Sequence, residues 1–284
     1  MNFIKIGFLM ALLTGLFVVA GAAIGGATGA VLAFVIAFVM NFSAYWFSDR
    51  FALAGSHAQE VTPEEAPELH AIVEELAQRA KMPKPRVYII DAPQPNAFAT
   101  GRNKSHAVVA VTTGILRILD RRELRGVLGH ELSHIGHRDM LVNSVVAVLA
   151  GAIVMIGNFA QFAAIFGSFG GRDDREGGSN IFTLLILALV MPLAATVVRL
   201  AISRACEYNA DSGGAKLTGD PESLASALLK LERGAAVTPA MPVNAALAPL
   251  FIVNPLKAVN FAGLFSTHPP IPERVERLRN MRGA

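Results

Sequence analysis

Residues 129–137 read Gly-His-Glu-Leu-Ser-His-Ile-Gly-His, the most informative stretch of this 284-residue chain. Asp120 is a suitable N-cap for a helix that runs through it. At about 100° per residue, His134 lies about 40° and Glu131 about 100° around the helix from His130, so the three side chains share one side. Two imidazoles one turn apart can both reach one ion at about 2.1 Å, with the carboxylate beside them placed to take a proton from water. The stretch therefore predicts a helix with a catalytic zinc site.

A third zinc ligand has to come from elsewhere in the chain. His137 is seven residues from His130, or about 10.5 Å along the helix axis, which is too far for one ion. Met140 occupies the place where a longer zinc motif has another histidine. Glu207 and Asp211 are four residues apart and share a helix face. We expect Glu207 to bind zinc and Asp211 to accept the N–H of a ligand histidine.

Composition and charge-free runs indicate an integral membrane protein. Hydrophobic residues make up 53% of the chain and charged residues 17%, against roughly 25% charged in ordinary soluble proteins. Residues 6–47 form a run of 42 without a charge, about twice the ~20 that cross a bilayer. Glycines interrupt this run, so we expect two helices over about 4–22 and 29–47. Two more charge-free runs, 140–171 and 177–198, flank a polar tip and predict a membrane hairpin rather than a buried soluble one.

The expected fold class is therefore a mainly α integral membrane protein with four transmembrane helices. Its parts are two transmembrane helices in 1–47, a catalytic part in 48–139, a transmembrane hairpin in 140–201 and a second catalytic part in 202–284. Basic residues that flank the spans on one side are Lys5, Arg50, Arg121, Arg122, Arg125, Arg138, Arg199 and Arg204, whereas the opposite tip holds Arg172 and Arg175. This bias places both catalytic parts in the cytoplasm, where the hairpin brings Glu207 close to the histidines. Reading the first span as a signal peptide cleaved near Ala20-Gly21-Ala22 leaves this placement unchanged.

Helices dominate the catalytic parts, with one small sheet. Apolar spacing predicts helices over 64–80 and 271–281, and an Asp-Pro pair predicts a helix start at 220–221. β-Branched and aromatic residues predict strands over 86–91 and 106–112.

At this point the chain resembles a known family. The motif at 129–134, the segment Ser-Arg-Ala-Cys-Glu-Tyr-Asn-Ala-Asp at 203–211 and the four-span layout are similar to those of the HtpX-type membrane zinc metalloproteases, gluzincins related to the type I CAAX prenyl endopeptidase. The resemblance covers nearly the whole chain. It implies a gluzincin-like α+β protease domain with one zinc ion per chain, held by the two motif histidines and Glu207, and Glu131 as general base. It also implies quality control, the cleavage of misfolded or damaged membrane proteins under stress, at the bacterial inner membrane.

Two further segments extend the resemblance. Asn96-Ala97-Phe98-Ala99-Thr100-Gly101 is similar to the gluzincin edge strand that pairs with substrate, which implies a substrate-binding role for Asn96, Ala97 and Phe98. A glycine-terminated turn is the alternative for this segment. Ser266-Thr267-His268-Pro269-Pro270 is similar to the histidine-proline segment of the family, and His268 could donate a hydrogen bond to the oxyanion or be a structural loop residue.

The sequence thus predicts a zinc endopeptidase that uses zinc-activated water, with protein or peptide substrates and a lipid bilayer as partners. A dedicated processing protease and a non-proteolytic zinc-binding membrane protein are the alternatives. The spans lack acidic, basic and histidine side chains, which argues against a transporter. The single cysteine, Cys206, excludes an internal disulfide, and no motif for binding nucleic acid is present.

Overall fold

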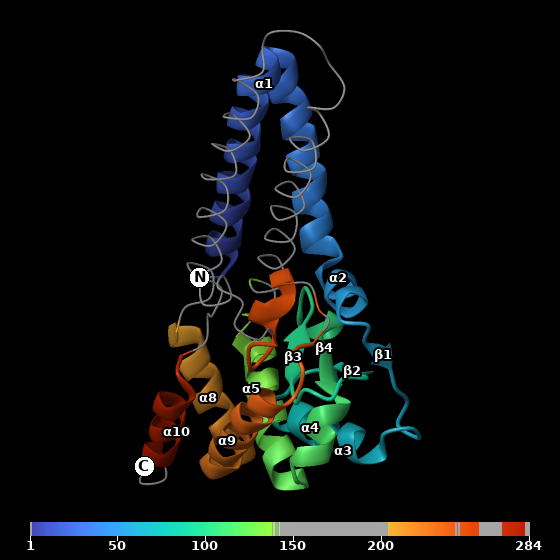
Figure 1. Cartoon of the computed structure of the whole chain (residues 1–284), viewed down its shortest axis with the longest axis vertical. Helices are drawn as coiled ribbons and strands as arrows, with labels where there is room; N and C mark the ends of the chain where they lie inside the picture. The colour runs from blue at the N-terminus through green and yellow to red at the C-terminus, as the bar shows by residue number, and fades with distance from the viewer. Residues whose placement is uncertain are drawn as a thin grey trace.

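The computed structural model describes residues 2–137, 139, 142, 204–241, 243, 245–255 and 269–281. Figure 1 shows a mainly helical protein, with a long helical hairpin at one end and a small sheet surrounded by helices at the other. The helices are α1 (Asn2–Trp46), α2 (Ser48–Gly55), α3 (Pro67–Arg79), α4 (Thr113–Ile118), α5 (Arg121–His137), α8 (Arg204–Thr218), α9 (Pro221–Val237) and α10 (Ile271–Asn280), with 3₁₀ turns η1 (Lys104–His106) and η2 (Ala245–Leu250).

The hairpin is formed by α1, which folds back on itself near its middle (Figure 1). Gly26 lies at this turn with a φ of +57°, a conformation that glycine adopts without a steric penalty. Asn41 ties the two arms together, because its side-chain amide donates to the Met10 carbonyl at 3.2 Å and to Thr14 Oγ1 at 2.8 Å. The glycine interruption in the sequence thus corresponds to a turn between two helical arms.

Among the described residues, one helical segment is long and apolar enough to cross a membrane. It is Gly26–Trp46, with 21 residues, and the other arm contains a shorter apolar stretch at Met10–Val19. Large apolar side chains on the longer segment, including Val35, Phe38 and Phe42, are more than half exposed. The two spans predicted between 140 and 198 lie outside the described residues.

The sheet has four strands in the order β1-β2-β4-β3. The central strands β2 (Arg86–Ile90) and β4 (Val108–Thr112) are parallel, and the outer strands β1 (Gln59–Glu60) and β3 (Ala97–Thr100) pair antiparallel to them. The strands predicted at 86–91 and 106–112 are confirmed to within two residues. The segment after Asn96 forms an edge strand rather than a turn.

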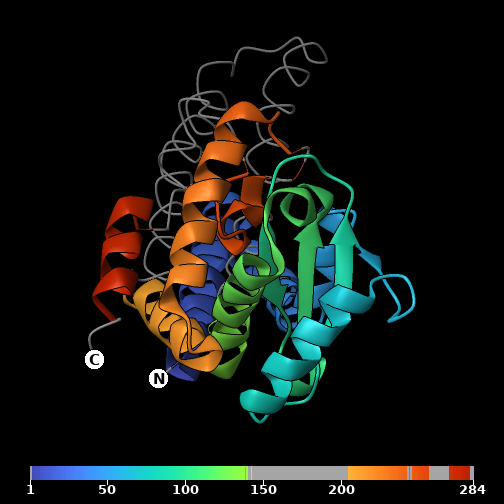
Figure 2. The ribbon, with the colours of Figure 1, turned by 90° about the horizontal axis from the view of Figure 1, so that it is seen from below.

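Helices α3, α5 and α9 cover one face of the sheet, and α2 with the region around η2 covers the other. Valines 87, 109 and 111 pack on apolar side chains of α3, α5 and α9, including Leu128 and Leu228. Figure 2 shows α5 beside the strands with α9 next to it. The opposite face packs against α2 and the η2 region. As a result, α5 lies in the centre of the catalytic part, with its motif side chains turned toward α8.

The predicted helices are present, with small shifts at their ends. The helix expected over 64–80 begins instead at Pro67. Proline fits the first turn of a helix, because backbone N–H groups there have no hydrogen-bond partner within the helix and proline has no N–H. The helix expected over 271–281 ends at Asn280, and α9 begins at Pro221 as predicted. The short elements α2, α4 and β1 were not predicted.

Candidate active site

A reciprocal cap fixes the start of α5. Asp120 Oδ1 accepts a hydrogen bond from the Glu123 backbone N–H at 2.8 Å, and Glu123 Oε2 accepts one from the Asp120 backbone N–H at 3.0 Å. This exchange satisfies N–H groups that have no partner inside the helix. Lys230 and Ser226 of α9 also bond to Glu123, so the helix that carries the motif is held at a defined position against α9.

Close packing of α5 on α8 brings the second half of the site into place. A Cβ atom added at Gly214 would lie 2.6 Å from the His130 backbone nitrogen, and one added at Gly129 would lie 2.8 Å from Thr218 Cγ2. Only residues without a side chain allow the two backbones to approach this closely. The approach sets Glu207, at the start of α8, opposite the two histidines.

The two histidines and Glu207 converge on one point. Glu207 Oε2 lies 3.9 Å from His130 Nε2, and Glu207 Oε1 lies 3.5 Å from His134 Nε2. The imidazole rings are 4.7 Å apart and nearly perpendicular. All three residues are buried, and their candidate ligand atoms lie within 4.8 Å of one another. Residues 77 positions apart in the sequence therefore form one compact cluster.

Each histidine also faces a carboxylate with its other ring nitrogen. His130 Nδ1 lies 2.9 Å from Asp211 Oδ1, and His134 Nδ1 lies 3.6 Å from Asp139 Oδ2. The Asp211 carboxylate is close enough to accept the Nδ1 proton of His130, which directs the Nε2 atom of that ring toward Glu207. Asp139 acts on His134 through its charge. Asp211 thus lies beside a histidine of the motif, and its role as acceptor of the histidine N–H stays a prediction. Asp139 was missed, although its place five residues after His134 was visible in the sequence.

Arg274, from α10, completes the cluster and was also missed. Its side chain is 0% exposed. Nε donates to Asp211 Oδ2 at 2.9 Å and Nη2 donates to Asp211 Oδ1 at 2.7 Å, while Nη1 lies 3.6 Å from Glu207 Oε2. Such a two-point contact fixes the carboxylate in one plane. Arg274 thereby positions Asp211, which in turn orients His130.

The site contains several acidic side chains that are buried close together. Burial alone would lower the pKa of His134, but Asp139, Glu207 and Glu131 outweigh it and raise that pKa to about 10. Burial alone would raise the pKa of Asp211, but the Arg274 guanidinium and His130 lower it to about 2. The cluster therefore favours a cation between the two imidazoles and Glu207.

The donor atoms fit a small divalent metal ion. The described cluster contains four buried carboxylates, from Glu131, Asp139, Glu207 and Asp211, and one buried arginine, so it carries excess negative charge. In a tetrahedral site with bonds of about 2.0–2.1 Å, neighbouring ligand atoms are about 3.4 Å apart, close to the 3.5 and 3.9 Å observed here. No other such group of histidine, cysteine or acidic side chains is present in the described ranges. His137 bonds instead with Ser133 of its own helix.

Glu131 is buried one residue after His130, on the helix that carries both imidazoles. Its charge acts on His134 and on Arg274, so it lies within electrostatic reach of the metal-ligand cluster. The sequence assigns Glu131 as general base, and this placement is compatible with that role. His268 lies outside the described residues.

The edge strand β3 is partly covered by a later segment of the chain. The Ile252 N–H donates to the Ala97 carbonyl at 3.1 Å, and the Asn96 side chain both donates to and accepts from the Val253 backbone. The Phe98 ring packs edge-on against Phe251 in the core. Residues expected to contact substrate are thus engaged within the protein. Because outward-facing backbone groups alternate along a strand, the next outward-facing pair on β3 after that of Ala97 belongs to Ala99.

Comparisons with known proteins agree with this site. The family model for peptidase family M48 matches residues 63–282. The chain belongs to this family. A protease HtpX homolog from Pyrococcus furiosus is 53% identical over 278 residues, covering 98% of this chain and 95% of the relative. A second, from Ralstonia pickettii, is 51% identical over 282 residues, covering 99% and 96%.

One solved structure shares the fold of this chain. The crystal structure of S. mikatae Ste24p aligns with a TM-score of 0.54 at 20% identity, covering 97% of this chain and 67% of that one. This likeness concerns the fold. Together, the family match and the two relatives identify this M48 chain as a membrane-associated metalloprotease. The histidine–histidine–glutamate cluster described above is a group of side chains that could hold its metal ion.

Proposed function

We propose that this M48 protease is a zinc endopeptidase of the cell membrane that degrades misfolded or damaged membrane proteins. The observation that carries the metal assignment is the convergence of His130 Nε2, His134 Nε2 and the Glu207 carboxylate within 4.8 Å. Two imidazoles and one carboxylate with an open fourth position form a ligand set typical of catalytic zinc. One ion per chain follows from the single cluster found in the described ranges.

We assign a proposed role to each residue of the site. A bound zinc ion supplies Lewis-acid polarisation of the substrate carbonyl and of the attacking water. Glu131 takes a proton from that water and delivers it to the departing amine. Asp211 and Asp139 keep the Nδ1 protons on the two histidines, so that both Nε2 atoms remain available as ligands. His268 is proposed as an additional hydrogen-bond donor to the oxyanion.

Substrate is proposed to bind as an added strand along β3. The predicted contacts with Asn96, Ala97 and Phe98 need revision, since both outward groups of Ala97 are already bonded. Its carbonyl accepts from the Ile252 N–H, and its own N–H donates to Asn96 Oδ1. We propose that a peptide pairs first with Ala99 and extends toward Ala97 only when 251–253 move away. Backbone pairing of this kind accepts many sequences, which suits an enzyme that removes damaged proteins.

The proposed membrane arrangement keeps four spans, in 1–47 and 140–201, with catalytic parts 48–139 and 202–284 on the cytoplasmic side. The support is the outward-facing apolar surface of Gly26–Trp46 together with the basic residues at the span ends. In a bacterium this is the inner membrane. Reporter fusions at the C-terminus, active only in the cytoplasm or only outside it, test the orientation.

The Glu131→Gln variant tests the proposed chemistry. It keeps the size of the side chain and removes the base, so zinc content should persist while cleavage of an unfolded protein falls by at least a hundredfold. Glu232→Gln, an exposed position on α9, is the matched control and should cleave normally. Retained cleavage by Glu131→Gln would reject the mechanism. Cleavage of a single native membrane protein, with unfolded proteins spared, would favour the dedicated processing protease, and zinc binding without any cleavage would favour a non-proteolytic role.

A further inference from the structure

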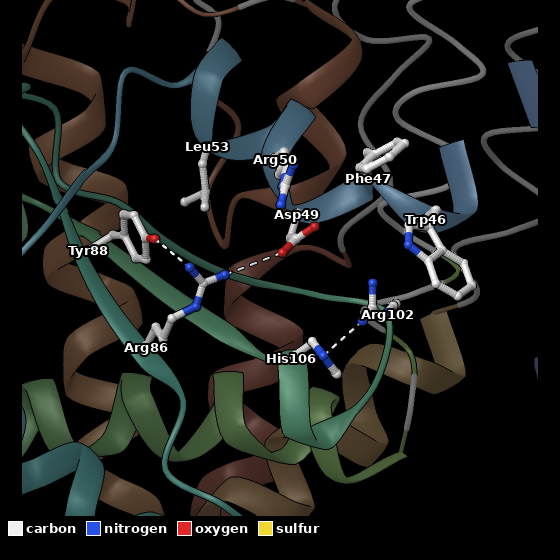
Figure 3. Close-up of a pocket in the computed structure, with 9 residues that line it drawn as sticks. All are labelled: Trp46, Phe47, Asp49, Arg50, Leu53, Arg86, Tyr88, Arg102 and His106. Carbon is white, nitrogen blue, oxygen red and sulfur yellow. Dashed lines mark hydrogen bonds and ion pairs between the residues drawn. The ribbon is translucent and has the colours of Figure 1, made fainter. Parts of the chain in front are cut away.

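A basic cavity lies where the longer arm of α1 meets the catalytic part. It has a volume of about 550 Å³ and is lined by Trp46, Arg50, Arg86 and Arg102, among others. Figure 3 shows these side chains around one opening, contributed by the end of α1, by α2, by β2 and by the turn after β3. Trp46 is the last residue of the segment long enough to cross a membrane. The cavity therefore lies at the level where the helix leaves the apolar layer.

Among the described residues, acidic side chains balance only one of the three arginines that line the cavity. Arg86 lies 3.3 Å from Asp49 and 3.8 Å from Glu60, and these carboxylates balance it. In the ranges that the structure describes, Arg50 and Arg102 form no ion pair. Arg102 Nη2 donates to His106 Nε2 at 2.8 Å, which leaves its other N–H groups available. The cavity is thus suited to an anion.

Aromatic rings hold the two unpaired guanidinium groups in place. The Arg102 guanidinium lies 4.7 Å from the Trp46 ring centroid, and that of Arg50 lies 5.4 Å from the Phe47 ring centroid. A guanidinium group that lies over an aromatic ring can still form paired hydrogen bonds with phosphate oxygens through its N–H groups. The arginines are thereby presented to a ligand with less loss of side-chain freedom on binding.

An apolar track leads from the cavity along α1. Phe38, Phe42 and Trp46 are spaced four residues apart, so they lie on one side of the helix, and all three are more than 40% exposed. The rings of Phe42 and Trp46 stack with centroids 5.8 Å apart. A ligand that combines an anionic group with an apolar tail matches this surface, whereas a free phosphate or a peptide carboxylate matches only the cavity.

We propose that this cavity binds the phosphate headgroup of an anionic phospholipid, with an acyl chain along Phe38 and Phe42. Arg50 and Arg102 contact the phosphate, and Trp46 lies at the boundary between headgroup and chain. Basic pockets beside membrane helices recognise anionic headgroups in this way. The inference depends on α1 crossing the membrane and is independent of the proposed peptidase chemistry, so it is tested by binding alone.

Trp46 provides a direct probe, because it is the only tryptophan in the chain. Full-length protein in neutral detergent micelles is titrated with phosphatidylglycerol carrying brominated acyl chains, which quench nearby tryptophan. We expect saturable quenching. Each arginine near an anionic membrane contributes about a fivefold change in binding, so Arg50→Gln or Arg102→Gln should weaken it about fivefold and the double variant about 25-fold. Brominated phosphatidylcholine should bind wild type about as weakly as phosphatidylglycerol binds the double variant.

Controls separate the headgroup site from general charge effects. Arg117→Gln/Arg121→Gln removes the same charge from exposed positions outside the cavity and should bind like wild type. Arg50→Lys/Arg102→Lys keeps the charge and should bind more tightly than the glutamine pair. The proposal is overturned if the glutamine pair binds like wild type or if phosphatidylcholine binds equally well. It is also overturned if millimolar inorganic phosphate or a short peptide with a free carboxylate displaces the lipid as effectively as unbrominated phosphatidylglycerol does.

Discussion

The contact between Arg274 and Asp211 gives the sharpest prediction about stability. Arg274 is fully buried, bonds to Asp211 at 2.7 and 2.9 Å, and lies 3.6 Å from Glu207. Arg274→Met preserves much of the volume but leaves two buried carboxylates without their cation. Removing one partner of a buried ion pair costs about 3–5 kcal/mol. We expect the free energy of unfolding of the catalytic part to fall by that amount.

The measurement is urea unfolding in micelles, followed by circular dichroism and performed with a chelator so that metal loss does not contribute. Adding Asp211→Asn to Arg274→Met should cost little more, giving a coupling energy of about 2 kcal/mol or greater. Arg279 and Glu222 form the control pair on α10 and α9, where Arg279 is 52% exposed, and their coupling should stay below about 1 kcal/mol. Equal effects at Arg274 and Arg279 would refute the reasoning.

Three other predictions address the site itself. Gly214→Ala should destabilise the protein by about 1–3 kcal/mol in thermal or urea unfolding, since its Cβ would meet α5 backbone at 2.6 Å, whereas Gly136→Ala should be tolerated because the nearest atom is 3.9 Å away. Asp139→Asn should lower zinc affinity about 10–100-fold in a competition titration, with Asp91→Asn as an unaffected control; equal affinities would exclude the orienting role of Asp139. In metal-free protein the raised pKa of His134 contributes stability that is fully present below about pH 6.5 and is lost as the pH rises toward about 10; unfolding measured across this window should show that loss, and a flat profile would contradict it.

Local signals made much of the scaffold predictable from the sequence. Asp120 and Glu123 indicate the start of α5, because the two residues of a capping box are only three positions apart in the sequence. Strands β2 and β4 were predicted because short runs rich in β-branched and aromatic residues are typical of strands. The two-residue strand β1 carries too little sequence to be recognised, and its pairing with β2 is set by the tertiary fold.

The parts of the site that were missed depend on contacts far apart in the chain. Arg274 meets Asp211 across 63 positions, and no local pattern encodes that distance. One signal was available in the sequence. Arg274 lies on the same helix face as the apolar residues Ile271 and Leu278, and an arginine on an apolar face that becomes buried requires an acidic or other polar partner. Coverage of β3 by residues 251–253 was likewise invisible, because backbone pairing depends little on side-chain identity.

The central claim is that His130, His134 and Glu207 bind one metal ion. Elemental analysis of purified variants for zinc tests it most directly. We expect about one zinc per chain in wild type, strong loss in Glu207→Ala, and near-normal content in His137→Ala, whose side chain bonds within its own helix. Normal zinc in Glu207→Ala together with loss in His137→Ala would contradict the account.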